Sequence, residues 1–255
     1  MNLLRATIRL LGLGGVTGFF YLRWLAGLPF VFTSKGHALR WRNRNFGSWA
    51  RTSARIMGLT VNVQNTPPDA PFLLISNHLS YVDVVVLASL LHCAFVAKSE
   101  VARWPMLGLI SSTLDTIFID RKKKHDVLRA MNTIETTLQR GLAVVLFAEG
   151  TSTGGGSPKP FKSSLLEFAA RRRLPVHYAS VSYAVPQGEQ PADQSVCWWG
   201  SMTFPDHLFR LLQLPEFEAK LTFGPQPIVG KDRHVLAAQL WSAVNAQLEP
   251  FRVES

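Results

Sequence analysis

Short apolar runs alternate with stretches of helical periodicity along most of the chain. Apolar runs bounded by turn residues are typical of buried strands, whereas apolar residues three and four apart indicate amphipathic helices. The predicted strands are residues 60–64, 72–76, 93–98, 116–119, 142–147, 175–183, 196–199 and 220–223. The predicted helices are residues 37–58, a helix that begins at Tyr81, residues 125–140, a helix that begins near Ser163, and residues 205–212 and 232–248. This alternation predicts an α/β fold with a mostly parallel central sheet flanked by helices.

The N-terminal segment is the most apolar part of the chain. Residues 10–32 carry no charge except Arg23 and are long enough for one membrane span. Basic residues flank the segment on both sides, and a single helix through it is weakened by Gly12, Gly14, Gly15 and Gly18. Because cations at both ends favour the cytoplasmic side, we expect residues 1–34 to form a re-entrant or interfacial helix pair. A single span and a cleaved signal peptide are the alternatives.

Residues 37–58 place aromatic and basic side chains at helical spacing. This pattern predicts a helix at the level of the lipid headgroups, and a solvated helix with a core-facing stripe would have the same pattern. We therefore assign residues 1–58 to N-terminal membrane-associating helices and residues 59–255 to one α/β domain.

The formal charge of +10 implies an anionic partner. Nucleic acid, an anionic membrane surface and a phosphorylated substrate are the candidates, and the apolar neighbours of the basic residues favour the membrane over nucleic acid. The two cysteines, Cys93 and Cys197, lie in apolar contexts without metal-ligand spacing. They predict reduced core thiols, no metal site and a domain on the cytoplasmic side of the membrane.

The apolar run at 72–75 ends at Ser76-Asn77-His78, and Asp83 follows His78 by five residues. Residues five apart point in different directions on one helix and to opposite faces on one strand, so His78 and Asp83 can meet only across a turn. Ser80 and Asp83 have the spacing of a capping box, which predicts the helix at Tyr81. A His oriented by a carboxylate is a general base, whereas the bland alternative is that Asp83 only caps the helix.

Two further predicted strands end in polar residues, at the edge where open α/β sheets bind ligands. Asp120-Arg121 follows the strand at 116–119, and the guanidinium of Arg121 suits a phosphate. Ala148-Glu149-Gly150-Thr151 follows the strand at 142–147, and the glycines at 154–156 offer backbone N–H groups to an anion.

Four sequence blocks resemble, in order and spacing, those of the glycerolipid acyltransferase family. The blocks are Asn77-His78 with Asp83, Phe118-Ile119-Asp120-Arg121, Phe147 with Glu149-Gly150-Thr151, and Leu174-Pro175-Val176. The resemblance covers about residues 70–185 and implies transfer of an acyl chain to the free hydroxyl of a lysophospholipid, most simply 1-acylglycerol 3-phosphate. Acyl-CoA or acyl carrier protein would supply the acyl thioester as a substrate, with no cofactor and no metal, at the cytoplasmic side of the inner membrane.

The resemblance also implies roles for individual residues. His78 is the base and Asp83 its partner, and the acceptor site consists of Lys98, Arg121, Glu149, Gly150 and Thr151. No covalent acyl-enzyme is needed, and backbone N–H groups of the His78 turn or of the Glu149 loop would stabilise the oxyanion.

The chain departs from the family pattern at Asp115, where Gly is usual, and at Ser152, where Arg often follows Glu-Gly-Thr. One fewer cation leaves open another lysolipid acceptor, such as an amino-acid lipid. A membrane lipid carrier without chemistry and a lipid hydrolase with a Ser nucleophile are the alternatives from other classes.

Overall fold

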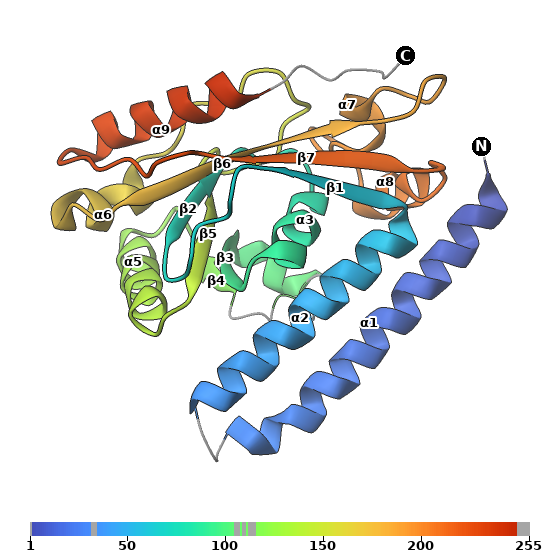
Figure 1. Ribbon diagram of the computed structural model, residues 1–255, viewed down its shortest axis with the longest axis horizontal. Helices are drawn as coiled ribbons and strands as arrows, with labels where there is room; N and C mark the ends of the chain where they lie inside the picture. The colour runs from blue at the N-terminus through green and yellow to red at the C-terminus, as the bar shows by residue number, and fades with distance from the viewer. Residues whose placement is uncertain (1, 32–34, 105–107, 109–110, 112–115, 249–255) are drawn as a thin grey trace.

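The computed structural model describes residues 2–31, 35–104, 108, 111 and 116–248, so Asp115 lies outside the described residues. Seven strands in this part of the chain are β1 (Leu59–Gln64), β2 (Leu73–Ser76), β3 (Cys93–Lys98), β4 (Ile117–Ile119), β5 (Ala143–Phe147), β6 (Val176–Ala184) and β7 (Phe217–Phe223). They form one sheet in the order β1-β7-β6-β2-β5-β3-β4 (Figure 1). Every neighbouring pair is parallel except β6 and β7, which confirms the mostly parallel sheet.

The central strands are apolar along their whole length because both faces of the sheet are covered. β2 and β5 are buried at every position, whereas buried and more exposed residues alternate along β1 and β7. Successive side chains of β2 enter different cores: Leu74 belongs to one, and Leu73 and Ile75 belong to the other.

Helices cover each core. The core of Leu74 is closed by α2 (Lys35–Met57), α3 (Val82–Leu90), α7 (Ala192–Ser195) and α8 (Phe204–Leu211). The core of Leu73 and Ile75 is closed by α5 (Lys124–Gln139), η2 (Ser164–Leu166), α6 (Glu167–Arg172) and α9 (Arg233–Gln247). A short helical turn, η1 (Ser99–Arg103), follows β3.

The N-terminal segment forms one unbroken helix, α1 (Leu3–Val31), so the expectation of a helix pair within residues 1–34 is wrong. The pair is formed instead by α1 and α2, which run side by side and project from the domain (Figure 1). Gly14, Gly15 and Gly18 lie on the helix with open space around them. Each glycine costs about 1 kcal/mol relative to Ala in a helix, and packing along α2 offsets this cost.

Polar bonds inside this helical hairpin fix the register of α1 against α2. Asn45 Nδ2 donates to the carbonyl oxygen of Phe20 at 2.9 Å, and Trp49 Nε1 donates to Thr17 Oγ1 at 3.2 Å. Ala6 and Leu13 of α1 are buried in the same core as α2 and α3. The hairpin is therefore packed as part of the fold.

The beginning of α1 is also bonded to the domain. The guanidinium groups of Arg5 and Arg9 donate to the carbonyl oxygens of residues 212–215, which follow the last turn of α8. Cations are favourable at a helix C-terminus, where carbonyl groups lack partners. Both ends of the hairpin are thus held at the domain.

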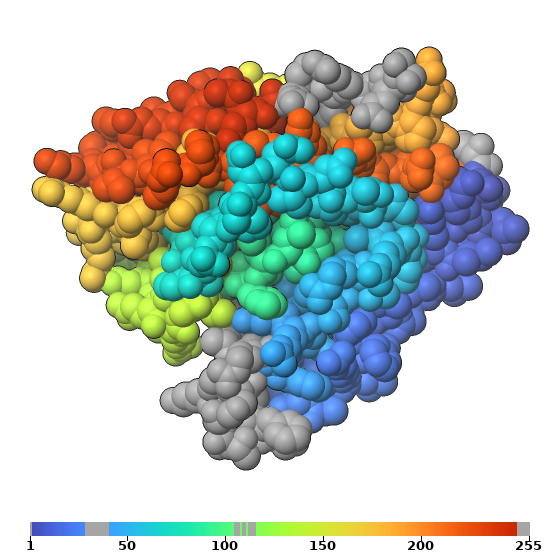
Figure 2. All heavy atoms as spheres, in the orientation of Figure 1, coloured from blue at the N-terminus to red at the C-terminus, as the bar shows by residue number. Residues whose placement is uncertain are grey.

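The outer side of α1 is apolar and exposed, and α1 lies along one margin of the molecule (Figure 2). Its most exposed apolar residues are Leu3, Leu4, Ile8, Leu11, Phe19 and Leu22. Residues Leu3–Leu28 are long and apolar enough to cross a membrane, with a mean hydropathy of 1.3. An uncovered apolar face of this extent marks a membrane or protein contact.

The predicted strand at 196–199 is wrong. Residues 196–199 follow α7 without joining the sheet, and Val196 and Cys197 are buried against the core of Leu74. The backbone N–H of Trp198 donates to the carbonyl oxygen of Leu79 at 2.8 Å. The first half of this apolar run is therefore buried, the run packs beside the turn after β2, and Trp199 is exposed. The other predicted strands and helices lie close to their observed positions.

Candidate active site

The turn after β2 brings His78 and Asp83 together. β2 ends at Ser76, α3 begins at Val82, and His78 Nδ1 lies 2.7 Å from Asp83 Oδ2. The prediction that the two residues meet across a turn is confirmed.

Asp83 is fully buried, and its carboxylate accepts four hydrogen bonds from described residues. Oδ2 accepts His78 Nδ1 and the backbone N–H groups of Leu79 at 2.7 Å and Ser80 at 3.1 Å, and Oδ1 accepts Tyr183 OH at 2.6 Å. These donors offset the cost of removing a carboxylate from water. The capping box is only half formed, since Ser80 Oγ has no hydrogen-bond partner among the described residues.

The backbone of His78 is fixed on both sides. Asn77 exchanges two hydrogen bonds with the backbone of Val181 on β6, at 2.9 and 2.8 Å. The N–H of His78 donates to Glu149 Oε1 at 2.7 Å, and its carbonyl oxygen accepts the N–H of Thr153 at 2.9 Å. The end of β2, the loop after β5 and the middle of β6 therefore position one residue.

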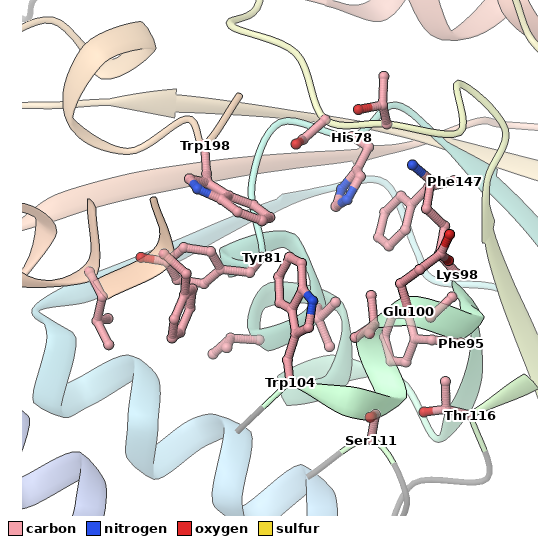
Figure 3. A pocket seen from close by; sticks show the side chains of 18 of the residues that line it. His78, Tyr81, Phe95, Lys98, Glu100, Trp104, Ser111, Thr116, Phe147 and Trp198 are labelled. Atoms are coloured by element: carbon pink, nitrogen blue, oxygen red, sulfur yellow. The ribbon is translucent and has the colours of Figure 1, made fainter. Parts of the chain in front are cut away.

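The imidazole of His78 stacks on Phe147 with ring centroids 4.2 Å apart. Because Nδ1 faces a carboxylate, it carries the proton, and Nε2 keeps its lone pair. Nε2 has no hydrogen-bond partner among the described residues, and the side chain is 21% exposed. Figure 3 shows His78 at the wall of a cavity that also contacts Phe147, with Tyr81, Trp104 and Trp198 across from it.

This cavity has a volume of about 480 Å³ and joins a polar end to an apolar end. The apolar end is lined by residues of the hairpin, α3 and α8, namely Leu10, Leu13, Trp49, Met57, Val84, Val85, Phe204 and Leu208. The polar end is lined by His78, Lys98, Glu100, Arg121, Gly150, Thr151 and Ser152. Such a cavity can hold an aliphatic chain with a reactive polar group beside His78.

Four of the five residues expected at the acceptor site lie at this polar end: Lys98, Arg121, Gly150 and Thr151. Arg121 is partly buried, and burial lowers the pKa of its guanidinium, opposed by the charge of Glu100. Among the described residues Arg121 Nε has no hydrogen-bond partner. The guanidinium is therefore available to an anionic ligand.

Glu149 does not line the cavity. It is buried, and its second oxygen accepts the N–H of Lys159 at 2.8 Å, so the carboxylate bridges the His78 turn and the loop before η2. Burial raises the pKa of Glu149, and the two backbone N–H groups oppose that shift. Its role as a substrate-binding residue stays a prediction, and the contacts observed are positioning ones.

Sequence reasoning missed Tyr183, which bonds Asp83, and Trp198, which lines the cavity. Tyr183 is fully buried on β6, and burial, followed by the neighbouring charge of Asp83, raises the pKa of its phenol, so the hydroxyl remains a donor to that carboxylate. Strand periodicity predicts that Tyr183 points inward, but no local pattern links it to a residue 100 positions earlier.

Residues 150–154 read Gly-Thr-Ser-Thr-Gly, the spacing of a hydrolase nucleophile elbow. Such an elbow joins a strand directly to a helix and aims the Ser at a His. Here a loop follows, the next helical turn begins at Ser164, and no hydrogen bond joins Ser152 to His78 in the described residues. The arrangement favours a base acting on a substrate hydroxyl over a Ser nucleophile.

The described residues contain no group of three His, Cys, Asp or Glu side chains that could hold a metal ion. Cys93 and Cys197 are buried free thiols, and burial raises the pKa of both.

The chain is similar to known acyltransferases over most of its length. The family model described as Acyltransferase matches residues 59–182. A lyso-ornithine lipid O-acyltransferase of Rhizobium meliloti is 31% identical, over 76% of this chain and 69% of that protein. A 1-acyl-sn-glycerol-3-phosphate acyltransferase of Neisseria gonorrhoeae is 25% identical, over 80% of this chain and 81% of that protein.

The fold has been seen before. The crystal structure of the 1-acyl-sn-glycerophosphate acyltransferase of Thermotoga maritima superposes with a TM-score of 0.65, covering 94% of this chain and 95% of that one, at 18% identity. The His78 and Asp83 turn, the sheet that presents it and these similarities lead to one conclusion: the chain belongs to the acyltransferase family whose members include lysolipid O-acyltransferases.

Proposed function

We propose that this protein transfers the acyl group of acyl-CoA or acyl carrier protein to the free hydroxyl of an anionic lysolipid, meaning one whose headgroup bears a carboxylate or a phosphate. The observation that carries the proposal is that His78 lines the same cavity as both the apolar residues and the polar residues named above, with Nε2 unbonded among the described residues. An acyl chain in the apolar end and an anionic headgroup in the polar end would bring their reactive groups to the same nitrogen.

In the first step, His78 Nε2 accepts the proton of the acceptor hydroxyl while that oxygen attacks the thioester carbonyl. Asp83 stabilises the imidazolium that forms, since it accepts the Nδ1 proton at 2.7 Å. The tetrahedral intermediate then collapses, the C–S bond breaks, and the imidazolium returns the proton to the departing thiolate. An ester and a free thiol are formed, and the base is regenerated.

The oxyanion is most readily stabilised by the Glu149 loop. The N–H groups of His78, Leu79 and Ser80 already donate to carboxylates, so these three groups are not available to an oxyanion. Thr151 and Ser152 line the cavity, and their backbone N–H groups are the candidates.

The apolar end of the cavity suits a fatty-acyl chain. Burying each methylene contributes about 0.8 kcal/mol, so an aliphatic chain gains binding energy with length until the cavity is full. Part of the wall comes from Leu10 and Leu13 of α1 and from Met57 of α2. The hairpin therefore has apolar side chains on two sides. One set is exposed on the outer side of α1, and the other lines the cavity.

The acceptor we favour is a lysolipid with an amino-acid headgroup, such as lyso-ornithine lipid, ahead of 1-acylglycerol 3-phosphate. A phosphomonoester carries a charge of roughly −1.5 to −2 at neutral pH. The ornithine headgroup offers one carboxylate, whose charge its side-chain ammonium balances. Ser152 supplies no cation where the family pattern often has one. The higher identity to the lyso-ornithine lipid enzyme supports the same order.

For the membrane, we propose that the hairpin of α1 and α2 enters the cytoplasmic leaflet of the inner membrane with both of its ends on the cytoplasmic side. Two observations support this. The outer side of α1 is apolar and exposed. The bonds from Arg5 and Arg9 to the domain would also keep the start of α1 on the side of the membrane where the domain lies.

A product analysis tests the function. Purified protein in detergent micelles is given one isotope-labelled acyl-CoA, or the same chain on acyl carrier protein, with a panel of lyso-ornithine lipid, 1-acylglycerol 3-phosphate and neutral monoacylglycerol. We expect a labelled diacyl product identified by mass from the anionic acceptors, with the amino-acid lipid preferred. Labelled free fatty acid as the main product would instead make the protein a hydrolase, and lipid binding without any product would make it a carrier.

A further inference from the structure

A second cation, from a part of the chain outside the four family blocks, lies beside Gly150, which lines the polar end of the cavity. A Cβ added to Gly150 would overlap Arg121 Nη1 and would lie 3.0 Å from Lys162 Nζ. Gly150 has φ +80°, a conformation that glycine adopts without strain. The missing side chain of Gly150 therefore leaves room for two cationic groups from different elements to converge.

The backbone holds Lys162 in this position. Its N–H donates to the carbonyl oxygen of Ala148 at 2.9 Å, and Lys159 on the same loop donates to Glu149. Trp241 of α9 donates to the carbonyl oxygen of Pro158 at 2.9 Å. The loop before η2 is thus bonded to the end of β5 and to α9, and Lys162 is presented to Gly150 from a fixed backbone.

Neither cation is held in an ion pair within the part of the chain that the structure describes. Among the described residues, the side chains of Arg121 and Lys162 form no ion pair and donate no hydrogen bond, although Glu100 lies near enough to act on Arg121. Two cations brought this close repel each other. An anion bound between them would be attracted by both and would offset that repulsion. The arrangement is that of a binding site for anionic oxygens.

We propose that Lys162 acts with Arg121 as a two-cation clamp over Gly150 that binds the anionic group of the acceptor lipid, a carboxylate or a phosphate. The inference rests on the proposed function, because it assumes that the polar end of the cavity receives the acceptor. The family pattern often has an Arg at the position of Ser152. In this chain Lys162, ten positions after Ser152, supplies a cation beside Gly150 instead. The clamp selects anionic over neutral lysolipids and leaves acyl-donor binding unchanged.

Substitution of Lys162 tests the clamp in the full-length protein. A hydrogen bond between charged groups contributes to the binding free energy of the acceptor. Its loss in Lys162→Met should raise KM for lyso-ornithine lipid, 1-acylglycerol 3-phosphate or both by roughly tenfold to a hundredfold. KM for acyl-CoA and the rate with monoacylglycerol should not change, and Lys162→Arg should recover most of the loss. A loss confined to one anionic acceptor would identify the headgroup that the clamp receives.

Lys159→Met is the matched control, since Lys159 is exposed on the same loop and its side chain is not among the atoms nearest Gly150. We expect it to behave as the unchanged protein does. Three results would overturn the clamp. Lys162→Met could weaken the use of neutral and anionic acceptors equally, Lys162→Arg could raise KM as much as Lys162→Met does, or Lys162→Met could leave KM unchanged.

A binding measurement separates this inference from the proposed function. Intrinsic tryptophan fluorescence, with Trp104, Trp198 and Trp199 lining the cavity, reports lysolipid binding without an acyl donor. The unchanged protein could form no ester product and still bind anionic lysolipids more tightly than monoacylglycerol. If Lys162→Met then removes that preference, the clamp is supported and the proposed reaction is contradicted. If the unchanged protein forms product but shows no such preference, the clamp falls and the reaction stands.

Discussion

The hydroxyl of Tyr183 should be needed to position Asp83, and Tyr183→Phe removes that one oxygen while keeping the ring. Asp83 Oδ1 would lose its 2.6 Å hydrogen bond in a site with no exposure to water. A hydrogen bond to a buried charged group contributes about 2 kcal/mol, so we expect a fall of this size in the free energy of unfolding and of roughly 4–8 °C in the melting temperature.

The same substitution should lower kcat. With Oδ1 unbonded, the carboxylate is held through Oδ2 alone and can tilt away from its best alignment with His78 Nδ1, so the imidazolium that forms during the reaction is stabilised less well. If about 1.4 kcal/mol of the lost energy is felt in the transition state, kcat falls roughly tenfold. KM for either substrate should stay the same, because Tyr183 does not line the cavity.

Steady-state acyl transfer and thermal unfolding of the purified full-length protein measure both effects. Tyr178→Phe is the matched control, since Tyr178 lies on the same strand, is partly buried and makes no hydrogen bond to the His78 turn. A Tyr183→Phe protein with unchanged kcat, or one in which only KM rises, would refute the positioning role.

Three further predictions concern the base, the neighbouring Ser and the hairpin. His78→Ala should reduce acyl transfer by orders of magnitude without changing the melting temperature or membrane binding, and substantial residual turnover at a normal KM would exclude His78 as the base. Ser152→Ala should keep kcat within a few fold, whereas complete loss of activity together with an acylated peptide containing residue 152 in the unchanged protein would indicate an acyl-enzyme. An Asn2→Cys protein should not react with a membrane-impermeant maleimide added to intact cells, and the two native cysteines, being buried, give little background; labelling there would place the start of α1 on the outside.

The parts of the site that depend on neighbouring residues were predictable from the sequence. His78 and Asp83 are five residues apart, and elementary strand and helix geometry allows them to meet only across a turn. Each of the buried central strands was visible as an apolar run that ends at a polar residue, and the carboxyl ends of parallel strands meet at one edge of a sheet.

The parts that depend on distant residues were not predictable. Tyr183 reaches Asp83 across 100 positions, and Lys162 meets Arg121 through a loop whose path is set by bonds to β5 and α9. The glycines of α1 predicted a broken helix because helix propensity does not include the packing that α2 supplies. The apolar run at 196–199 has the composition of a strand, but it bonds to the His78 turn through the N–H of Trp198 and buries only Val196 and Cys197.

The bonds of Arg9 have a consequence for the order in which the molecule is made. Arg9 leaves the ribosome well before its carbonyl partners, which lie more than 200 positions later, at Leu212, Leu214 and Pro215. At roughly 5–20 residues per second, those partners are synthesised about 10–40 seconds after α1. During that interval Arg9 lacks its acceptors, so in the membrane arrangement proposed above α1 contacts lipid before it docks on the finished domain.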